Sequence, residues 1–285
     1  MRPAERLLTF LLEFPYMKKF VVLDKRIGET PLESLTAWKK LHPVYETVPA
    51  TYAGRLDPMA SGKLLILLGE ECKQKQKYTG LDKEYVVNVL LDISTDTGDT
   101  LGLPSCTEQV TVPTIEHIRE VLKAEVGTYS RTYPSYSSKT VGGVPLFLHT
   151  LRGTLSNIEV PSHTEAIHAI QLLSVTTSDL DTLSSHIEQI LQRVPRDSSS
   201  TKQLGADFRQ DEIREAWRAL FSSMNERGFV ILKLRVSCGT GSYMRTLSER
   251  IGRGLGTTAL AISILRTKIG RYHTLGPFSF FFPSL

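Results

Sequence analysis

Apolar and polar residues alternate along the chain with two different periods, which predicts both strands and helices. Period-two alternation and short apolar runs predict strands at residues 18–25, 63–68, 84–93, 166–176, 229–236 and 271–275, and another apolar segment covers residues 259–267. Apolar positions at helical spacing predict helices at residues 114–126, 180–194, 211–224 and 242–255.

A further helix is predicted to begin after Thr30. Thr30 caps it, Pro31 fits its first turn and Glu33 closes a capping box. Strands and helices follow one another irregularly, with hairpin-like neighbours. This order predicts an α+β fold with a mixed, mainly antiparallel sheet flanked by helices and loops.

Four segments interrupt the periodic pattern. Residues 1–17 form an N-terminal extension and are predicted to be a short amphipathic helix, because no cleavage site for a signal peptide follows. Residues 50–62 are rich in small residues and predict a loop. Residues 133–153 predict a long ordered loop, a kind of segment that is commonly functional. Residues 177–227 are polar between helical flanks and predict an inserted helical hairpin with a flexible tip.

Composition narrows the class of protein only slightly. The 285 residues fit one large domain or two small ones, and the net charge of +4 favours a nucleic-acid ligand only weakly. The three cysteines form no C-x-x-C pair, which argues against a disulfide framework and a zinc site and favours a reducing compartment. No apolar run is long enough to span a membrane, so we expect a cytoplasmic protein.

Asp57 is the first residue that suggests chemistry. It precedes Pro58, which pushes it out of the helical region, and Gly54 and Gly62 let the backbone bend on either side. A carboxylate held on such a loop suits nucleophilic or electrostatic catalysis. An Asp-Pro pair alone is equally typical of an ordinary turn.

The neighbours of Asp57 favour the chemical interpretation. The run Gly54-Arg55-Leu56-Asp57-Pro58-Met59-Ala60-Ser61-Gly62, followed by Leu67-Leu68-Gly69-Glu70, resembles the G-x-L-D-P-x-A-[ST]-G…L-G-E signature of TruB-type tRNA pseudouridine synthases. Further segments resemble motifs of that family in the same chain order: Leu23-Asp24-Lys25, Asp82-Lys83-Glu84-Tyr85, Thr95-Asp96-Thr97-Gly98-Asp99, Pro134-Ser135-Tyr136-Ser137, Pro145-Leu146-Phe147, Gly239-Thr240-Gly241-Ser242-Tyr243-Met244-Arg245 and Leu265-Arg266-Thr267. The resemblance covers about residues 18–275 apart from the polar insertion.

This resemblance implies a reaction and a set of catalytic residues. The reaction is isomerisation of the T-loop uridine at tRNA position 55 to pseudouridine, without a cofactor or a metal. Asp57 would be the nucleophile, Arg245 its ionic partner, and Tyr85 the residue that stacks on the flipped-out base and serves as a general base. The implied partner is the tRNA T-arm, and the enzyme is expected to be a monomer.

The resemblance also implies contacts with the substrate or the RNA. The residues are Lys25, Tyr52, Arg55, Lys139, Arg152, Tyr243 and Leu265. Lys25 and Tyr243 match pocket positions but are equally compatible with structural roles, and Leu265 matches a pocket wall but also suits a core. Residues 18–285 would then form the catalytic domain, with residues 133–153 as an RNA-clamp loop whose Lys139 and Arg152 bind phosphates.

Two departures from the family pattern keep alternatives open. Tyr52 stands where the family usually has a histidine, and the small C-terminal RNA-binding PUA domain of bacterial members is expected to be absent. A synthase with another RNA target, including guide-RNA types, is a first alternative, although the missing PUA domain argues against guidance. A catalytically impaired TruB-like protein that binds or folds tRNA is a second. An aspartate-dependent glycosidase, with Asp96 or Asp99 as acid, is a third.

Overall fold

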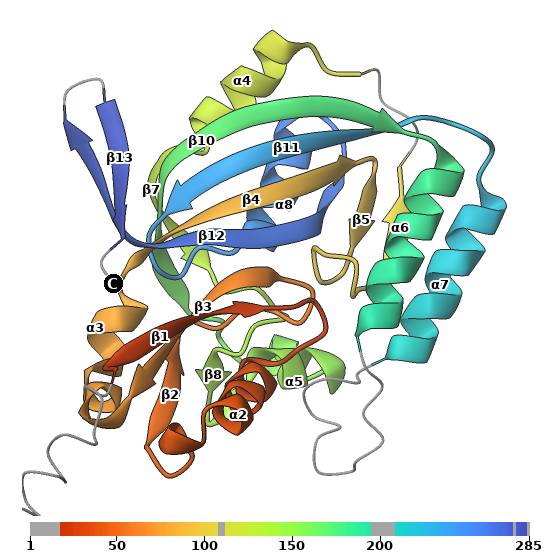
Figure 1. Ribbon diagram of the computed structural model, residues 1–285. Coiled ribbons are helices and arrows are strands. Elements are labelled where there is room, and N and C mark those ends of the chain that lie inside the picture. Colours follow the sequence, from red (N-terminus) through yellow and green to blue (C-terminus); the bar gives the residue numbers. More distant parts are fainter. Residues whose placement is uncertain (1–17, 108–111, 195–208, 276–277, 284–285) are drawn as a thin grey trace, which may run out of the picture.

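The computed structural model describes residues 18–107, 112–194, 209–275 and 278–283, and the predicted helix at 1–17 and the tip of the insertion lie outside them. A nine-stranded sheet forms its centre, in the order β1-β3-β12-β4-β11-β10-β7, with β2 added to β3 and β13 to β12 (Figure 1). The strands are β1 (Phe20–Lys25), β2 (Ala50–Ala53), β3 (Ser61–Leu68), β4 (Asp82–Leu91), β7 (Gly127–Thr132), β10 (Ser162–Ser178), β11 (Phe229–Cys238), β12 (Ala259–Leu275) and β13 (Phe278–Pro283).

Antiparallel pairing dominates this sheet. Among the described strands, β12 pairs with β3 in parallel and every other pair of the large sheet is antiparallel. Two small hairpins lie outside it, formed by β5 (Ile93–Thr95) with β6 (Pro104–Cys106) and by β8 (Thr140–Val141) with β9 (Val144–Pro145). The predicted α+β fold with a mainly antiparallel sheet is therefore confirmed.

Helices cover both faces of the sheet. They are α2 (Pro31–Leu41), α3 (Lys75–Thr79), α4 (Ile115–Ala124), α5 (Leu146–Leu151), α6 (Leu180–Arg193), α7 (Gln210–Ser223) and α8 (Met244–Gly254), with short 3₁₀ turns at Pro43–Tyr45, Gly69–Gln74 and Leu155–Asn157. The predicted capping box of α2 is present, because Thr30 Oγ1 accepts from the Glu33 amide and the Glu33 carboxylate accepts from the Thr30 amide. No helix in the described part of the chain is long and apolar enough to span a bilayer.

Side-chain alternation along β12 directs its residues into two separate cores. Ala259 and Ala261 of β12 face a core shared with α4 and α8, while Leu260 faces a core shared with α6 and α7. On α8, Met244, Leu247 and Ile251 repeat at helical spacing and are all buried in the first core. Each such side chain contributes about 1.5–3 kcal/mol by leaving water. This packing holds the first turn of α8 in place, where the candidate site lies.

The structure corrects three sequence-based boundaries. The loop predicted at 50–62 begins as β2 and ends as β3, so it is confined to residues 54–60. The segment 133–153 contains the β8–β9 hairpin and α5, which are too short to show a period. The strand expected at 271–275 is the end of β12, whose register shifts between Arg266 and Lys268 break the alternation. The predicted helices at 180–194 and 211–224 correspond to α6 and α7.

Candidate active site

A cavity of about 680 Å³ lies between the 54–60 loop, β4, the start of α8 and the segment after β7. Its size is in the range of small-molecule sites. Six of the site residues predicted from the sequence line it: Tyr52, Arg55, Asp57, Tyr85, Tyr243 and Arg245. Residues that are far apart along the chain are thus brought together at one place.

The loop that carries Asp57 is anchored by its own apolar residues. Leu56 and Met59 are buried in the core, whereas the Asp57 side chain between them keeps 43% of its surface exposed. A turn closes the loop, because the Ala60 amide donates to the Asp57 carbonyl at 3.0 Å. The carboxylate therefore faces the cavity from a backbone that is held on both sides.

Two buried cations hold the carbonyl groups of this loop. The Lys25 ammonium donates to Ala60 O at 2.6 Å and to Arg26 O at 2.9 Å, and burial lowers its pKa to about 8 against the opposing charges of Glu29 and Asp57. Arg266 donates to Gly54 O at 3.0 Å and to Lys63 O at 2.6 Å. The structure places Lys25 beneath the loop rather than in the cavity lining. Both cations thus support the backbone around Asp57.

Arg245, in the first turn of α8, orients the Asp57 carboxylate through its guanidinium. Its Nε donates to Asp57 Oδ2 at 2.8 Å, Nη1 to Thr97 O at 2.6 Å and Nη2 to Tyr136 O at 2.9 Å. Its side chain is only 4% exposed. Burial alone would lower the pKa of Arg245, but the carboxylates of Asp57 and Asp99 outweigh it and raise the pKa. A permanently charged guanidinium therefore faces Asp57.

A second carboxylate, Asp99, shares this arginine. Its Oδ2 lies 3.7 Å from Arg245 Nε, and its Oδ1 accepts from Thr97 Oγ1 at 2.8 Å and from the Leu101 amide at 2.9 Å. Burial, reinforced by the charge of Asp57, raises its pKa to about 6, while Arg245 acts in the opposite direction. The sequence had indicated Asp99 only as an acid for the glycosidase alternative. In the structure it also forms an ion pair with Arg245, the partner of Asp57.

Tyr85 forms the floor of the cavity. It lies in the middle of β4, opposite Arg266 on β12, and its ring is buried. Burial raises the pKa of its hydroxyl, and the nearby Arg266 guanidinium partly opposes this shift. At neutral pH the side chain is therefore protonated, and it presents an aromatic face that suits stacking on a base.

Two further tyrosines border the cavity. Tyr243 contacts Tyr133 and His163 edge to face, with ring centroids 6.3 and 6.0 Å apart. Tyr52 lies below two cations, with Lys75 Nζ 5.2 Å and Arg55 Cζ 5.9 Å from its ring centroid. The position of the usual histidine is thus an aromatic ring flanked by positive charge.

The remaining predicted contacts lie outside the cavity lining. Ile264 and Arg266 line it, whereas Leu265 between them does not and is 40% exposed. Because successive strand residues point to opposite faces, the apolar wall expected from Leu265 is supplied by Ile264, which is a correction. Lys139 Nζ lies 5.2 Å from the Tyr133 ring centroid, and Arg152 is exposed at the end of α5.

Three residues in or next to the site were not predicted from the sequence: Arg266, Tyr136 and Arg209. Arg266 had a signal, because a charged residue inside an apolar strand must find buried partners. Tyr136 belongs to a recognised motif, and its backbone carbonyl accepts from Arg245. In the described residues, no group of three or more His, Cys, Asp or Glu side chains is arranged to bind a metal.

Comparisons with known proteins show the family of the chain. The model of the TruB family pseudouridylate synthase N-terminal domain matches residues 43–190, about half of the chain. The tRNA pseudouridine synthase B of Deinococcus deserti is 30% identical over 228 residues, which cover 80% of this chain and 67% of that protein. The tRNA pseudouridine synthase B of Aromatoleum aromaticum is 28% identical over 265 residues, with 92% and 67% covered.

A solved structure shares the fold. The match is to a crystal structure of a Cbf5–Nop10–Gar1 complex, with a TM-score of 0.51 and 20% sequence identity over 94% of this chain. The chain spans about half the length of that protein, since 51% of it is covered. At this level of identity the match shows the arrangement of the sheet and helices alone.

Proposed function

The chain belongs to the TruB family of pseudouridylate synthases, and on that basis we propose that it converts the T-loop uridine at tRNA position 55 to pseudouridine. The observation that carries this proposal is the contact between Asp57 and Arg245 at the edge of the cavity, 2.8 Å between Oδ2 and Nε. The contact joins two residues 188 positions apart, each taken from a different family motif. Both residues line the same cavity as Tyr85, which supports the proposal of a nucleophile and its countercharge beside an aromatic floor.

Asp57 acts as the nucleophile of the reaction. Its carboxylate forms a bond to C1′ of the ribose while the N1–C1′ glycosidic bond breaks and its electron pair moves to the uracil. The uracil turns, and C5 bonds to C1′ and displaces the carboxylate. The hydrogen on C5 then leaves as a proton to water, and N1 takes up a proton, so that the rearranged base is neutral again. Arg245 neutralises Asp57 before the reaction, and the 43% exposure of Asp57 leaves room for the ribose.

The aromatic residues of the cavity receive the flipped-out base. Extrusion from the T-loop costs a few kcal/mol, roughly what stacking on an aromatic side chain returns, about 1–3 kcal/mol per base. Tyr85 provides the stacking face, Ile264 an apolar wall, and Tyr243 and Tyr52 the sides.

Basic residues at the rim of the cavity and outside it bind the RNA backbone. Arg55 at its rim, together with Lys139 and Arg152 of segment 133–153, contacts phosphates of the T-arm. The enzyme works as a monomer in the cytoplasm and uses no cofactor. We propose these properties for this chain because its sequence resembles the family.

The experiment follows the C5 hydrogen directly. The purified chain is incubated with an unmodified tRNA transcript that carries tritium at C5 of its uridines, and a transcript with cytidine at position 55 serves as control. Tritium release from the first RNA and not from the second is expected. Tritium release from both RNAs would mean that the enzyme modifies a uridine other than the one at position 55, and free uracil would indicate a hydrolase. Tight binding without release would favour a tRNA-binding or tRNA-folding protein, the alternative suggested by Tyr52.

A further inference from the structure

The inserted hairpin of α6 and α7 packs against the motifs that form the site. Figure 1 shows the two helices side by side at one end of the sheet. Trp217 of α7 is buried and donates from Nε1 to the Thr100 carbonyl at 3.0 Å, beside Asp99. The end of α6 lies against Gly28, where an added Cβ would overlap the Arg193 carbonyl oxygen. The insertion therefore touches the chain directly after two motif segments, through a side-chain hydrogen bond at Thr100 and a close backbone approach at Gly28.

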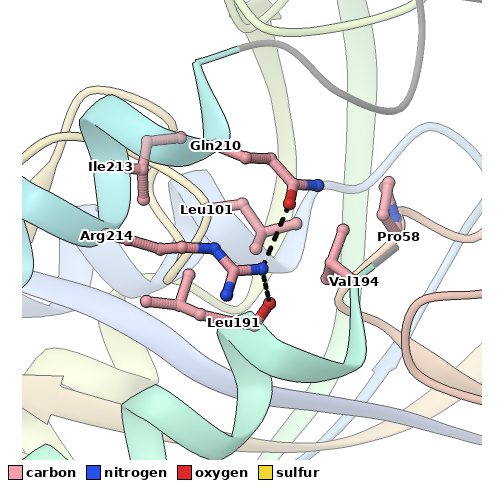
Figure 2. A pocket seen from close by; sticks show the side chains of 7 residues that line it. All are labelled: Pro58, Leu101, Leu191, Val194, Gln210, Ile213 and Arg214. Atoms are coloured by element: carbon pink, nitrogen blue, oxygen red, sulfur yellow. Dashed lines mark hydrogen bonds between the residues drawn. The ribbon is translucent and has the colours of Figure 1, made fainter. Parts of the chain in front are cut away.

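The ends of the two helices also face the loop that carries Asp57. Figure 2 shows Val194 beside Pro58, with Leu101 and Ile213 completing an apolar contact around a cavity of only about 20 Å³. Arg214 joins the two helices there, because it donates from Nη2 to the Leu191 carbonyl at 2.6 Å. A gap of this size holds about one water molecule at most. The hairpin is thus packed tightly against the residue that follows Asp57.

Arg209, immediately before α7, makes the most specific of these contacts. Its Nη1 donates to Asp96 Oδ2 at 2.7 Å, and its guanidinium carbon lies 5.2 Å from the centroid of the Tyr136 ring. Its φ of 58° is in the left-handed region, which is unfavourable for an L residue. Such strain persists only where surrounding contacts determine the conformation. The ion pair and the ring contact supply them here.

Asp96 and Tyr136 connect Arg209 to the catalytic pair. The Tyr136 hydroxyl donates to Asp96 Oδ2 at 2.8 Å, and the carbonyl of the same tyrosine accepts from Arg245 Nη2 at 2.9 Å. Burial would raise the pKa of Asp96, but hydrogen bonds from Arg209, Tyr136 and the Leu103 amide outweigh it and lower the pKa. The anionic Asp96 therefore accepts from the Tyr136 hydroxyl, while the Tyr136 carbonyl accepts from Arg245.

We propose that Arg209, supplied by the insertion, is a positioning residue that aligns Arg245 with Asp57 through Asp96 and Tyr136. The inference rests on the proposed function for its kinetic consequence. Arg209 does not line the cavity, so it acts on the geometry of the site and not on the substrate. The same contact holds Tyr136, which lies within segment 133–153.

Arg209→Met tests this role. A single-turnover rate about tenfold lower at saturating tRNA is expected, with the tRNA dissociation constant changed by less than about twofold, since one charge-assisted hydrogen bond is lost. Arg209→Lys keeps the charge beside Asp96 and is expected to recover most of the rate. Arg218→Met is the matched control, because Arg218 also lies on α7 but pairs with Glu188 on the exposed side, 3.4 Å away. It should behave as the wild type. Asp96→Asn provides a second variant with the expected rate loss if Arg209→Met does not fold.

Several results would overturn the inference. A wild-type rate in folded Arg209→Met would show that Arg209 does not position the site. An equal loss of rate in Arg218→Met would mean that Arg209 has only a general structural role. A loss confined to the dissociation constant would make Arg209 an RNA contact.

Hydrogen exchange of peptides covering residues 133–138 separates this inference from the proposed function. Faster exchange in Arg209→Met than in Arg218→Met is expected whether or not the chain acts on tRNA. If the wild type releases no tritium, the proposed function fails, and unchanged exchange in Arg209→Met would then overturn the positioning role as well.

Discussion

Replacing Arg245 with methionine is expected to make the stability of the protein strongly dependent on pH. The wild-type guanidinium faces two carboxylates, of which Asp99 is 5% exposed and lies 3.7 Å away. Methionine fills a similar volume but leaves Asp99 in the interior without its countercharge. Removing one partner from a buried ion pair typically costs about 3–5 kcal/mol.

The pH dependence follows from the pKa of Asp99. Its value of about 6 in the folded protein lies above the ordinary 3.8, so the folded state binds the proton more tightly than the unfolded state. Ionisation of Asp99 therefore lowers the free energy of unfolding as the pH rises, by about 3 kcal/mol in the wild type. Without Arg245 the folded pKa rises further, and each additional unit removes about 1.4 kcal/mol at alkaline pH. Near pH 5 Asp99 is protonated in both proteins and this difference disappears.

Urea unfolding of wild type and Arg245→Met at pH 5 and pH 8 measures the effect. The variant is expected to be less stable at both pH values, with a deficit about 2 kcal/mol larger at pH 8. Burial also raises the pKa of Glu249 on the same helix, against the opposing charge of Arg245, so an Asp99→Asn background assigns the effect. In that background most of the pH dependence of the deficit should vanish. An equal deficit at pH 5 and pH 8 in the native background would show that Arg245 does not lower the pKa of Asp99.

Three other predictions concern the backbone, the base and the RNA. Gly28→Ala should lower the free energy of unfolding by about 3 kcal/mol and Gly69→Ala by about 1 kcal/mol in urea titrations, because both have positive φ but only Gly28 would clash with backbone; equal losses would contradict this. Tyr85→Phe should lower the single-turnover rate on tRNA about 100-fold with little change in tRNA affinity, because the ring remains and the hydroxyl is lost. An unchanged rate would mean that Tyr85 acts only by stacking on the base. Arg152→Ala should reduce the slope of log affinity against log salt by about 1, whereas Arg235→Ala, which removes an arginine bonded to Gln171, should leave it unchanged.

Local signals were sufficient for some elements of the fold. The capping box at Thr30 specifies the start of α2 through contacts between residues three apart. The apolar positions of α6 and α7 repeat at helical spacing, so both helices could be predicted inside a polar segment. A strand was also predicted at the end of β12, but its continuity with residues 259–267 was not, because the register shift between Arg266 and Lys268 interrupts the strict alternation.

The site shows the same division between local and long-range information. Asp57, Tyr85 and Arg245 lie in motifs, and the structure brings them to one cavity. Leu265 was misplaced by one residue, because a motif does not state which face of a strand each member occupies. The contact of Arg209 with Asp96 spans 113 residues and crosses the insertion, so no pattern along the chain could have indicated it.

The most direct test of the account is tritium release from C5-labelled tRNA by Asp57→Asn. Asparagine keeps the size of the side chain and an oxygen that accepts from Arg245, so the thermal midpoint should change little. Asp24→Asn is the matched control, because Asp24 is exposed and pairs with Lys63 outside the cavity. Release should fall at least about 1000-fold in Asp57→Asn and remain at the wild-type rate in Asp24→Asn. Release by Asp57→Asn within about tenfold of the wild type would contradict the central claim that Asp57 is the nucleophile.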